Sequence, residues 1–334
     1  MTYTRVCHQH GVPAQFIAKI GRFFMKIAQI AAVAALAIMA SSVSAYADNL
    51  EIIVPFSAGG GTDTVARMFE PDFSKAIGKT SIIRNVAGAS ATLGAAQVLD
   101  SKPDGATVGY MPIGPISIQP FLRKLTYGTD SFSFICQTTS TPIFLLSSGT
   151  NGINTVEDAV NKGTSGRVVY GSSGPGTIIH IAMAAFSDAA GLNAVHLPFA
   201  GTGPAMNALV GGEIDLFADT ATVMEANNLK ALAIFAPERS PAYPDVPTLG
   251  ELGFEGMDFS VWQGLVGQKD LDPAIVKTYT KACRASLEGD RFQKFSKQSN
   301  TGIKYRNPEE FEAFAKSNAK VNQKILEDAG LVAK

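Results

Sequence analysis

One unit occurs twice in the chain and constrains its fold more than any other feature. It consists of a short apolar strand, a glycine-rich loop and a helix in direct succession. The strand Leu50–Val54 leads into the loop Pro55–Gly61, and the strand Arg167–Tyr170 leads into the loop Gly171–Gly176. Apolar residues at helical spacing follow each loop. Because strands alternate with helices, we expect parallel sheets with helices on their faces, which is the α/β class.

Local signals predict where these helices begin and end. A side-chain oxygen of Thr62 or Asp63 can cap the first helix, and Gly78 can end it. Thr177 opens the second helix and Gly191 closes it. Further elements are expected as follows: strands at 194–199, 214–218 and 229–235, a third glycine loop at 200–203 with Pro204 opening a helix, and helices covering a sheet from Pro273 onward.

The first 47 residues have the composition of a secretory signal peptide. They hold four cations, no Asp or Glu, and an apolar run at 27–40. Small residues follow and end in the A-x-A cleavage pattern Ala45-Tyr46-Ala47. The run is shorter than the about 20 residues of a membrane span, and no cysteine near the cleavage point can accept a lipid. We expect export and cleavage at this point. Met25 is a second conventional translation start. Residues 1–24 are therefore either a mis-assigned extension or part of a long n-region of the signal peptide.

Composition and charge exclude several classes of protein. The chain has 334 residues, of which 46% are apolar and 17% charged. It is therefore not a disordered chain, and it is long enough for two domains of roughly 100–200 residues each. Without residues 1–47 it carries 24 cations and 29 anions, a net charge of −5. Nucleic-acid binding needs a basic surface, so we expect none.

Cys136 and Cys283 are the cysteines that remain after removal of the signal peptide. They could form a disulfide in an oxidising compartment. Two buried free thiols are the simpler interpretation, because free cysteine is among the most buried residue types. Beyond residue 47 the sequence has no C-x-x-C motif and no cluster of Cys and His, so we expect no metal site and no cofactor.

The glycine loops offer a site for an anion. A strand, a glycine loop and a helix together place unpaired backbone amides and the positive end of a helix dipole at one point. The first two loops add hydroxyl groups, and the third adds Thr202. Such neutral donors can hold a small carboxylate without an arginine. The alternative is that each loop is only a tight turn, for which glycine is also the usual residue.

Enzyme motifs are incomplete. Ser172-Ser173 lies between a strand and a helix like a nucleophile elbow, but Pro175 breaks the G-x-S-x-G pattern. His180 could pair with one of these serines, yet no acid partner is placed beside it. A serine hydrolase that depends on Ser173 is therefore a remote alternative, and we expect no enzymatic activity.

Seven short blocks between about residue 50 and about residue 332 carry a resemblance to a known family. They are Val54–Asp63, Asn85–Ala89, Pro103–Gly105, Gly171–Thr177 followed by His180, Val195–Gly201, Arg239–Thr248 and Trp262–Gly264. In this order they resemble the substrate-binding receptors of tripartite tricarboxylate transporters, the Bug receptors. Each block is weak by itself, and the ordered set is specific.

The resemblance implies a periplasmic binding protein of the two-lobed, type II-like Venus-flytrap class, each lobe a sheet flanked by helices. Lobe 1 would be discontinuous, with residues 48–142 and 251–334, and lobe 2 would hold residues 143–250. The strands that cross between the lobes would lie near 135–146 and 257–266. A small carboxylate would bind in the cleft, and the receptor, a monomer, would deliver it to a membrane permease.

The resemblance also implies which residues hold the ligand. One ligand carboxylate would be gripped by the glycine loops, often through ordered water. Carried over position by position, the ligand-binding residues are Phe56, Ser57, Ala58, Gly60, Thr62, Asp63, Ser172, Ser173, Gly176, Thr177, Ala200, Gly201 and Asp219. Asp63 would be an anion beside an anion site. We interpret it first as a helix cap that orients water, and second as a contact for a ligand ammonium.

Two regions depart from the family pattern. Asp215–Lys230 is shorter, with Asp219–Thr222 in place of the usual loop, and Met111–Ile116 is apolar where related receptors often place Ser or Thr. Both regions would line the far end of the cleft. An apolar far wall would suit an aromatic or monocarboxylic acid better than the usual dicarboxylate.

The leading function is therefore capture of a small carboxylate by closure of two α/β lobes, for transport and without covalent chemistry. In an alternative from another class, the same receptor would present its closed form to a sensor kinase instead of a permease.

Overall fold

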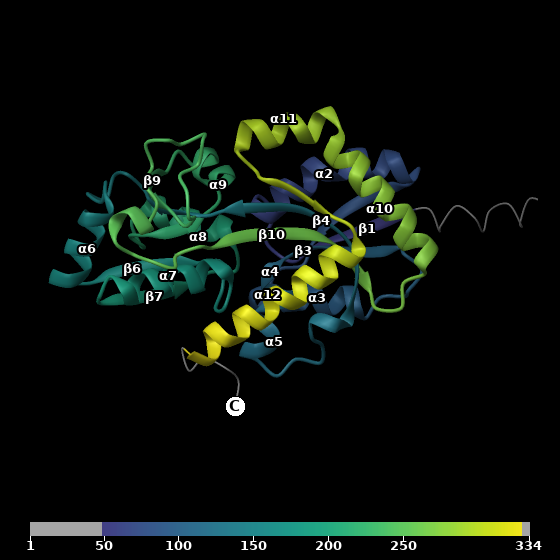
Figure 1. Ribbon diagram of the computed structural model, residues 1–334, viewed down its shortest axis with the longest axis horizontal. Coiled ribbons are helices and arrows are strands. Elements are labelled where there is room, and N and C mark those ends of the chain that lie inside the picture. Colours follow the sequence, from purple (N-terminus) through teal and green to yellow (C-terminus); the bar gives the residue numbers. More distant parts are fainter. Residues whose placement is uncertain (1–48, 329–334) are drawn as a thin grey trace, which may run out of the picture. The chain divides into compact units, whose positions relative to one another are not determined.

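A computed structural model of the chain describes residues 49–328. The predicted signal peptide lies outside the described residues. The described chain forms a six-stranded, a three-stranded and a two-stranded sheet, with helices packed around them (Figure 1). No helix within 49–328 is long and apolar enough to cross a membrane.

The six-stranded sheet has the strand order β11-β4-β10-β3-β1-β2. Its strands are β1 (Asn49–Val54), β2 (Thr80–Asn85), β3 (Thr107–Pro112), β4 (Phe132–Pro142), β10 (Ser260–Gln268) and β11 (Ile303–Arg306). The expected parallel pairing is confirmed for β1 with β2 and β3. It is wrong for β10 and β11, which pair antiparallel with their neighbours. The sheet is mixed because the chain leaves it after β4 and enters it again at β10.

Helices cover both faces of this sheet. They are α2 (Gly61–Ile77), η2 (Ala89–Ala91), α3 (Thr92–Leu99), α4 (Ile113–Ser117), α5 (Gln119–Leu122), η3 (Thr129–Ser131), α10 (Pro273–Glu288), α11 (Asp290–Ser299) and α12 (Pro308–Asp328). Both α10 and α12 contact β4, which confirms that the C-terminal helices cover a sheet. The sequence patterns missed β11, which lies between α11 and α12.

Helix α2 follows the first glycine loop and packs by its aromatic residues. Phe69 and Phe73 are fully buried, and their rings contact those of Tyr110 and Tyr279. Gly78 ends the helix in the left-handed conformation, φ 67°, as expected. The N-cap is Gly60 and makes no side-chain cap bond. The prediction that Thr62 or Asp63 caps the helix is therefore wrong, because the helix begins two to three residues earlier.

The two smaller sheets are built from residues 144–234. The first has the order β8-β5-β9, with β5 (Phe144–Ser147), β8 (Phe217–Asp219) and β9 (Lys230–Ile234), and its strands pair antiparallel, so the expected parallel pairing is wrong there. The second pairs β6 (Val168–Ser172) in parallel with β7 (Ala194–Pro198), as expected. Their helices are α6 (Val156–Ser165), α7 (Ile178–Ala189), α8 (Thr202–Gly211) and α9 (Ala221–Ala226), with η4 (Gly250–Leu252) after β9. Thr177 caps α7 as expected, since its Oγ1 accepts from the amide of His180. Helix α8 begins two residues before Pro204.

Strands β4 and β10 run side by side and connect the six-stranded sheet with the smaller ones (Figure 1). They pair from Ser260–Pro142 to Gln268–Phe132. Beyond this ladder the amide of Ile143 donates to Phe259, and the backbone of Phe235 bonds with both residues. Two adjacent strands therefore carry the chain from one group of sheets to the other and back.

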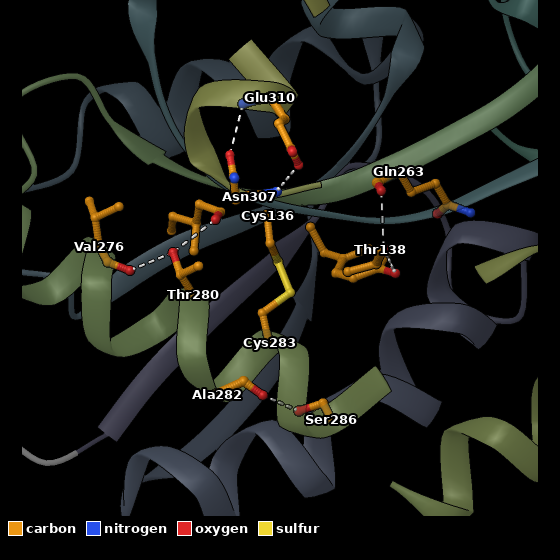
Figure 2. Close-up of a disulfide and its surroundings, with 12 residues drawn as sticks. Cys136, Thr138, Gln263, Val276, Thr280, Ala282, Cys283, Ser286, Asn307 and Glu310 are labelled. Carbon is orange, nitrogen blue, oxygen red and sulfur yellow. Dashed lines mark hydrogen bonds between the residues drawn. A yellow bond between two sulfur atoms is a disulfide. The ribbon is translucent and has the colours of Figure 1, made fainter. Parts of the chain in front are cut away.

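Cys136 of β4 and Cys283 of α10 form a disulfide (Figure 2). Both residues are fully buried. The interpretation as free thiols is wrong, because α10 packs across β4 and brings the two Cα atoms to 6.6 Å, within the range that a disulfide spans. The two cysteines are 147 positions apart in the sequence, and no local pattern predicts that they approach each other.

Candidate functional site

A cavity of about 50 Å³ lies where the first and second glycine loops meet. One side of its wall comes from the six-stranded sheet and its loops: Phe56, Gly60, Gly61, Thr62, Pro112, Ile113, Gly114, Val261 and Gln263. The other side comes from residues 173–220: Ser173, Thr177, Ile178, Ile179, Thr202, Asp219 and Thr220. Both groups of sheets therefore contribute to one site.

Five helices begin at this cavity. The first or capping residues of α2, α4, α7, α8 and α9 all line it. The first amides of a helix have no acceptor within that helix, and its N-terminus carries a partial positive charge. The lining residues include no Lys, Arg or His. The wall therefore presents helix amides to a ligand without a formal cation.

The first glycine loop keeps its conformation through Asp63, which is 2% exposed. This carboxylate accepts from the amide of Gly59 at 2.9 Å, from Arg67 Nε at 2.8 Å and from Asn85 Nδ2 at 2.8 Å. Burial raises the pKa of Asp63, but these hydrogen bonds outweigh it and hold the pKa below its usual value. Asp63 does not line the cavity. Its partners hold the loop in place and leave the α2 amides free.

Most hydrogen bonds of the second glycine loop hold the loop itself in place. Ser172 is fully buried, and its Oγ bonds with both the amide and the carbonyl of Gly174. The amide of Gly176 donates to His180 Nδ1 at 3.0 Å, and its carbonyl accepts from Gln119 Nε2 at 2.7 Å. Ser172 and Gly176 therefore support the loop and do not line the cavity.

Two stacked histidines lie beneath this loop. The rings of His180 and His196 are 4.0 Å apart, and the ring of Tyr170 stacks on His196 at 5.1 Å. Ser172 Oγ lies 2.6 Å from His196 Nε2. Burial, and then the charge of His180, lower the pKa of His196 to about 4. The serine in contact with a histidine is thus Ser172, which is bonded within its own loop. The Ser173–His180 pair that the remote hydrolase alternative would need is not among the hydrogen bonds of the described residues.

Asp219 is the one charged residue among those that line the cavity. It ends β8 and is 5% exposed. Oδ2 accepts from Thr202 Oγ1 at 2.8 Å, and Oδ1 accepts from the amide of Thr220 at 2.8 Å. Burial raises the pKa of Asp219 to about 6, and these hydrogen bonds oppose the shift only in part.

A second cavity, of about 300 Å³, lies on the other side of Phe56 and Ser173, which line both. Ala200 and Arg123 are in its wall, together with residues 88–91. In that segment Ala89, Ser90 and Ala91 all have positive φ. Ser90 Oγ donates to the carbonyl of Pro175 at 2.7 Å, so the segment also joins the two groups of sheets.

The structure brings some of the predicted site residues together and not others. Six line the first cavity: Phe56, Gly60, Thr62, Ser173, Thr177 and Asp219. Seven do not: Ser57, Ala58, Asp63, Ser172, Gly176, Ala200 and Gly201. Of these seven, Ser57 donates to the carbonyl of Ala200 at 3.1 Å and lies against Gly201.

Several wall residues were not predicted as ligand contacts. Gly61, Ile178 and Ile179 belong to the first turns of helices whose start was predicted, so the signal was present. Pro112–Gly114 belongs to the apolar segment that was expected at the far end of the cleft, and it does line the cavity with Thr220. Gln263 comes from β10 and had no signal apart from its place in a family block. No group of three or more potential metal ligands occurs among residues 49–328.

Comparisons with known proteins agree with one another. The family model described as "Tripartite tricarboxylate transporter family receptor" matches residues 65–331. The "UPF0065 protein in gbd 5'region" of Cupriavidus necator is 28% identical over 320 residues, which is 92% of this chain and 97% of the relative. The solved structure of the periplasmic binding protein BugD superposes with a TM-score of 0.80 at 27% identity, and covers 86% of this chain and 99% of its own.

MatC from Rhodopseudomonas palustris, solved with bound malate, gives a TM-score of 0.77 at 25% identity and covers 83% of this chain and 98% of its own. The fold is the α/β fold of periplasmic binding proteins, as expected. The resemblance noted in the sequence is confirmed, and the interpretation as a hydrolase is wrong, because the family consists of binding proteins. The chain belongs to the receptor family of the tripartite tricarboxylate transporters and is a solute-binding protein.

Proposed function

We propose that the protein captures a small organic carboxylate in the periplasm and delivers it to the membrane subunits of a tripartite transporter. The ligand lies between two lobes, one made of residues 48–142 and 251–334 and the other of residues 143–250. The observation that carries the proposal is the convergence of five helix N-termini on a cavity without a formal cation. Such a wall attracts a carboxylate and gives its oxygens several donors.

Closure of the lobes on the ligand is the mechanism. Contacts between the lobes already exist beside the cavity, from Ser57 to Ala200 and from Gln119 to Pro175. A ligand that bonds with amides from both lobes stabilises the closed arrangement by its differential affinity.

The wall also favours an acid with an apolar body. Ile113, Ile178, Ile179 and Val261 line the cavity beside the helix termini. The malate bound to the relative MatC supports a test of dicarboxylates as well. The panel therefore contains aliphatic mono-, di- and tricarboxylates, aromatic acids and acidic amino acids.

The test is a thermal-shift screen of residues 48–334 against this panel. A ligand at about 100 times its Kd stabilises the folded protein by roughly 2.7 kcal/mol, which is easily measured. We expect at least one acid to give such a shift. A folded protein that no acid stabilises would contradict the proposal.

A variant within the wall makes the test specific. A Cβ at Gly61 would lie 3.4 Å from Val223 and 3.6 Å from Asp219, which are ordinary contacts. Gly61→Ala should therefore fold and weaken the ligand-induced shift, because its methyl group occupies part of the cavity that Gly61 lines. Gly211→Ala, where nothing lies within 4 Å of the added Cβ, is the control and should keep the shift.

A further inference from the structure

The cavity wall offers many donors, and two of its side chains present oxygens that can only accept hydrogen bonds. One acceptor is Asp219, whose carboxylate faces Thr202 and Thr220 from its own lobe and lies next to Gly61 of α2, where an added Cβ would be 3.6 Å from Oδ1. The other is the amide of Gln263. The two come from different lobes, and a carboxylate ligand cannot satisfy either, because an ionised carboxylate only accepts hydrogen bonds.

Gln263 lies in β10, in the strand pair that connects the lobes, and is 3% exposed. Its backbone carbonyl accepts from Thr138 Oγ1 at 3.0 Å (Figure 2). Its side-chain Oε1 is buried and has no hydrogen-bond partner among residues 49–328. Buried acceptors of this kind are rare in folded proteins, since leaving one unpaired is costly. A hydrogen-bond donor on the bound ligand would pair with Gln263 Oε1.

We infer that the ligand is a carboxylic acid that also carries a hydrogen-bond donor, a hydroxyl or an ammonium group, which donates to Gln263 Oε1. An ammonium group has further protons and donates to the Asp219 carboxylate as well. This inference rests on the proposed function and narrows its ligand class. The carboxylate of the ligand bonds with the helix amides, and the donor on the neighbouring carbon turns toward the two acceptors. An acid without the donor leaves Gln263 Oε1 unpaired in a closed cavity, and sites built in this way reject such analogues strongly.

The test compares three trios of acids, each with an unsubstituted, a hydroxy and an amino member. They are propionate, lactate and alanine; succinate, malate and aspartate; and 3-phenylpropionate, 3-phenyllactate and phenylalanine. The Kd values are measured by titration calorimetry on residues 48–334. In the trio that binds, we expect the hydroxy or the amino member to bind at least about tenfold more tightly than the unsubstituted acid.

Two variants test whether Gln263 and Asp219 cause this preference for a donor-bearing acid. Gln263→Met keeps the volume of the side chain and removes its acceptor, so the donor-bearing acid should weaken about tenfold and the unsubstituted acid less than about twofold. Asp219→Asn distinguishes a ligand ammonium group from a ligand hydroxyl group. An ammonium group needs the charged carboxylate, whereas a hydroxyl group can also donate to the amide oxygen of Asn. Gln137→Met, on the adjacent strand where the amide is bonded to Thr139 and Arg306, is the control and should keep the preference even if it lowers the melting temperature.

Equal or tighter binding of the unsubstituted acid would overturn the inference and leave the proposed function standing. So would an equal loss for all members of a trio in Gln263→Met. Failure of the nine acids and of the whole thermal-shift panel to bind a folded protein would overturn the inference together with the proposed function.

Discussion

The two glycine loops of this receptor have the same sequence pattern and use it in different ways. The first, Pro55–Gly61, is held by Asp63 from outside the cavity and leaves the first amides of α2 free to face it. The second, Gly171–Gly176, is held by Ser172, His180 and Gln119, and Ser173 is its one residue that lines the cavity. A glycine-rich loop before a helix thus does not reveal whether its glycines let a ligand approach or let other parts of the chain pack closely.

The largest expected difference between the loops is the loss of stability when one glycine is replaced by alanine. Gly176 has φ +68°, and a Cβ there would lie 2.0 Å from Leu122 Cδ1 and 2.8 Å from Gln119 Nε2. Gly176→Ala should lower the free energy of unfolding on the order of 3 kcal/mol, from backbone strain and overpacking together. At Gly60, φ is −77° and the nearest atom to an added Cβ is 3.4 Å away. Gly60→Ala should fold normally and lose ligand affinity, as chemical denaturation and calorimetry would show.

Gly191→Ala is the matched control for Gly176. It also has a positive φ, 61°, but nothing lies within 4 Å of the added Cβ. Gly191→Ala should lower the free energy of unfolding by about 1 kcal/mol, which is the backbone strain alone. Equal losses at 176 and 191 would contradict the account of the second loop as a packed structure.

The next difference lies in the acid that faces the first loop. The pKa of Asp219 is about 6 in the folded protein against an ordinary 3.8, so the unfolded chain ionises first. Stability is therefore lost as pH rises from about 4 to about 6, by up to about 3 kcal/mol. Asp219→Asn should gain stability relative to the wild type across this window, as urea unfolding of the ligand-free protein at several pH values would show. A stability difference between variant and wild type that does not change with pH would refute this.

The histidine beneath the second loop should respond in the opposite direction. The pKa of His196 is about 4 in the folded protein against an ordinary 6.5, because of burial and of the charge of His180. The unfolded chain then takes up the proton first, and stability is lost as pH falls from about 6.5 toward 4. His196→Gln should remove that loss in the same unfolding experiment. Parallel pH profiles for His196→Gln and the wild type would show that the ring does not titrate in this way.

Local signals predicted the helices of the site, and long-range contacts decided its details. Thr177 caps α7 because capping depends on neighbours within one turn, and the first turns of α2 and α7 do line the cavity. The role of Gly176 depends on Leu122, from a helix more than fifty residues earlier, and no local pattern contains that contact. The same reason explains the missed Gln263, which β10 brings to the cavity, and the missed disulfide.

The smallest expected difference concerns one serine in each loop. Ser172 is fully buried and bonded within its loop, so Ser172→Ala should cost about 1–3 kcal/mol of stability because it leaves Gly174 and His196 without their partner. Ser57 is only partly buried, and its Oγ makes one bond, to Ala200 of the other lobe. Ser57→Ala should cost less than about 0.5 kcal/mol, because water replaces an exposed bond easily. It should weaken ligand binding about twofold, since the lost bond joins the lobes in the closed arrangement. A larger stability loss for Ser57→Ala than for Ser172→Ala would reverse the assignment of the two loops to binding and to support.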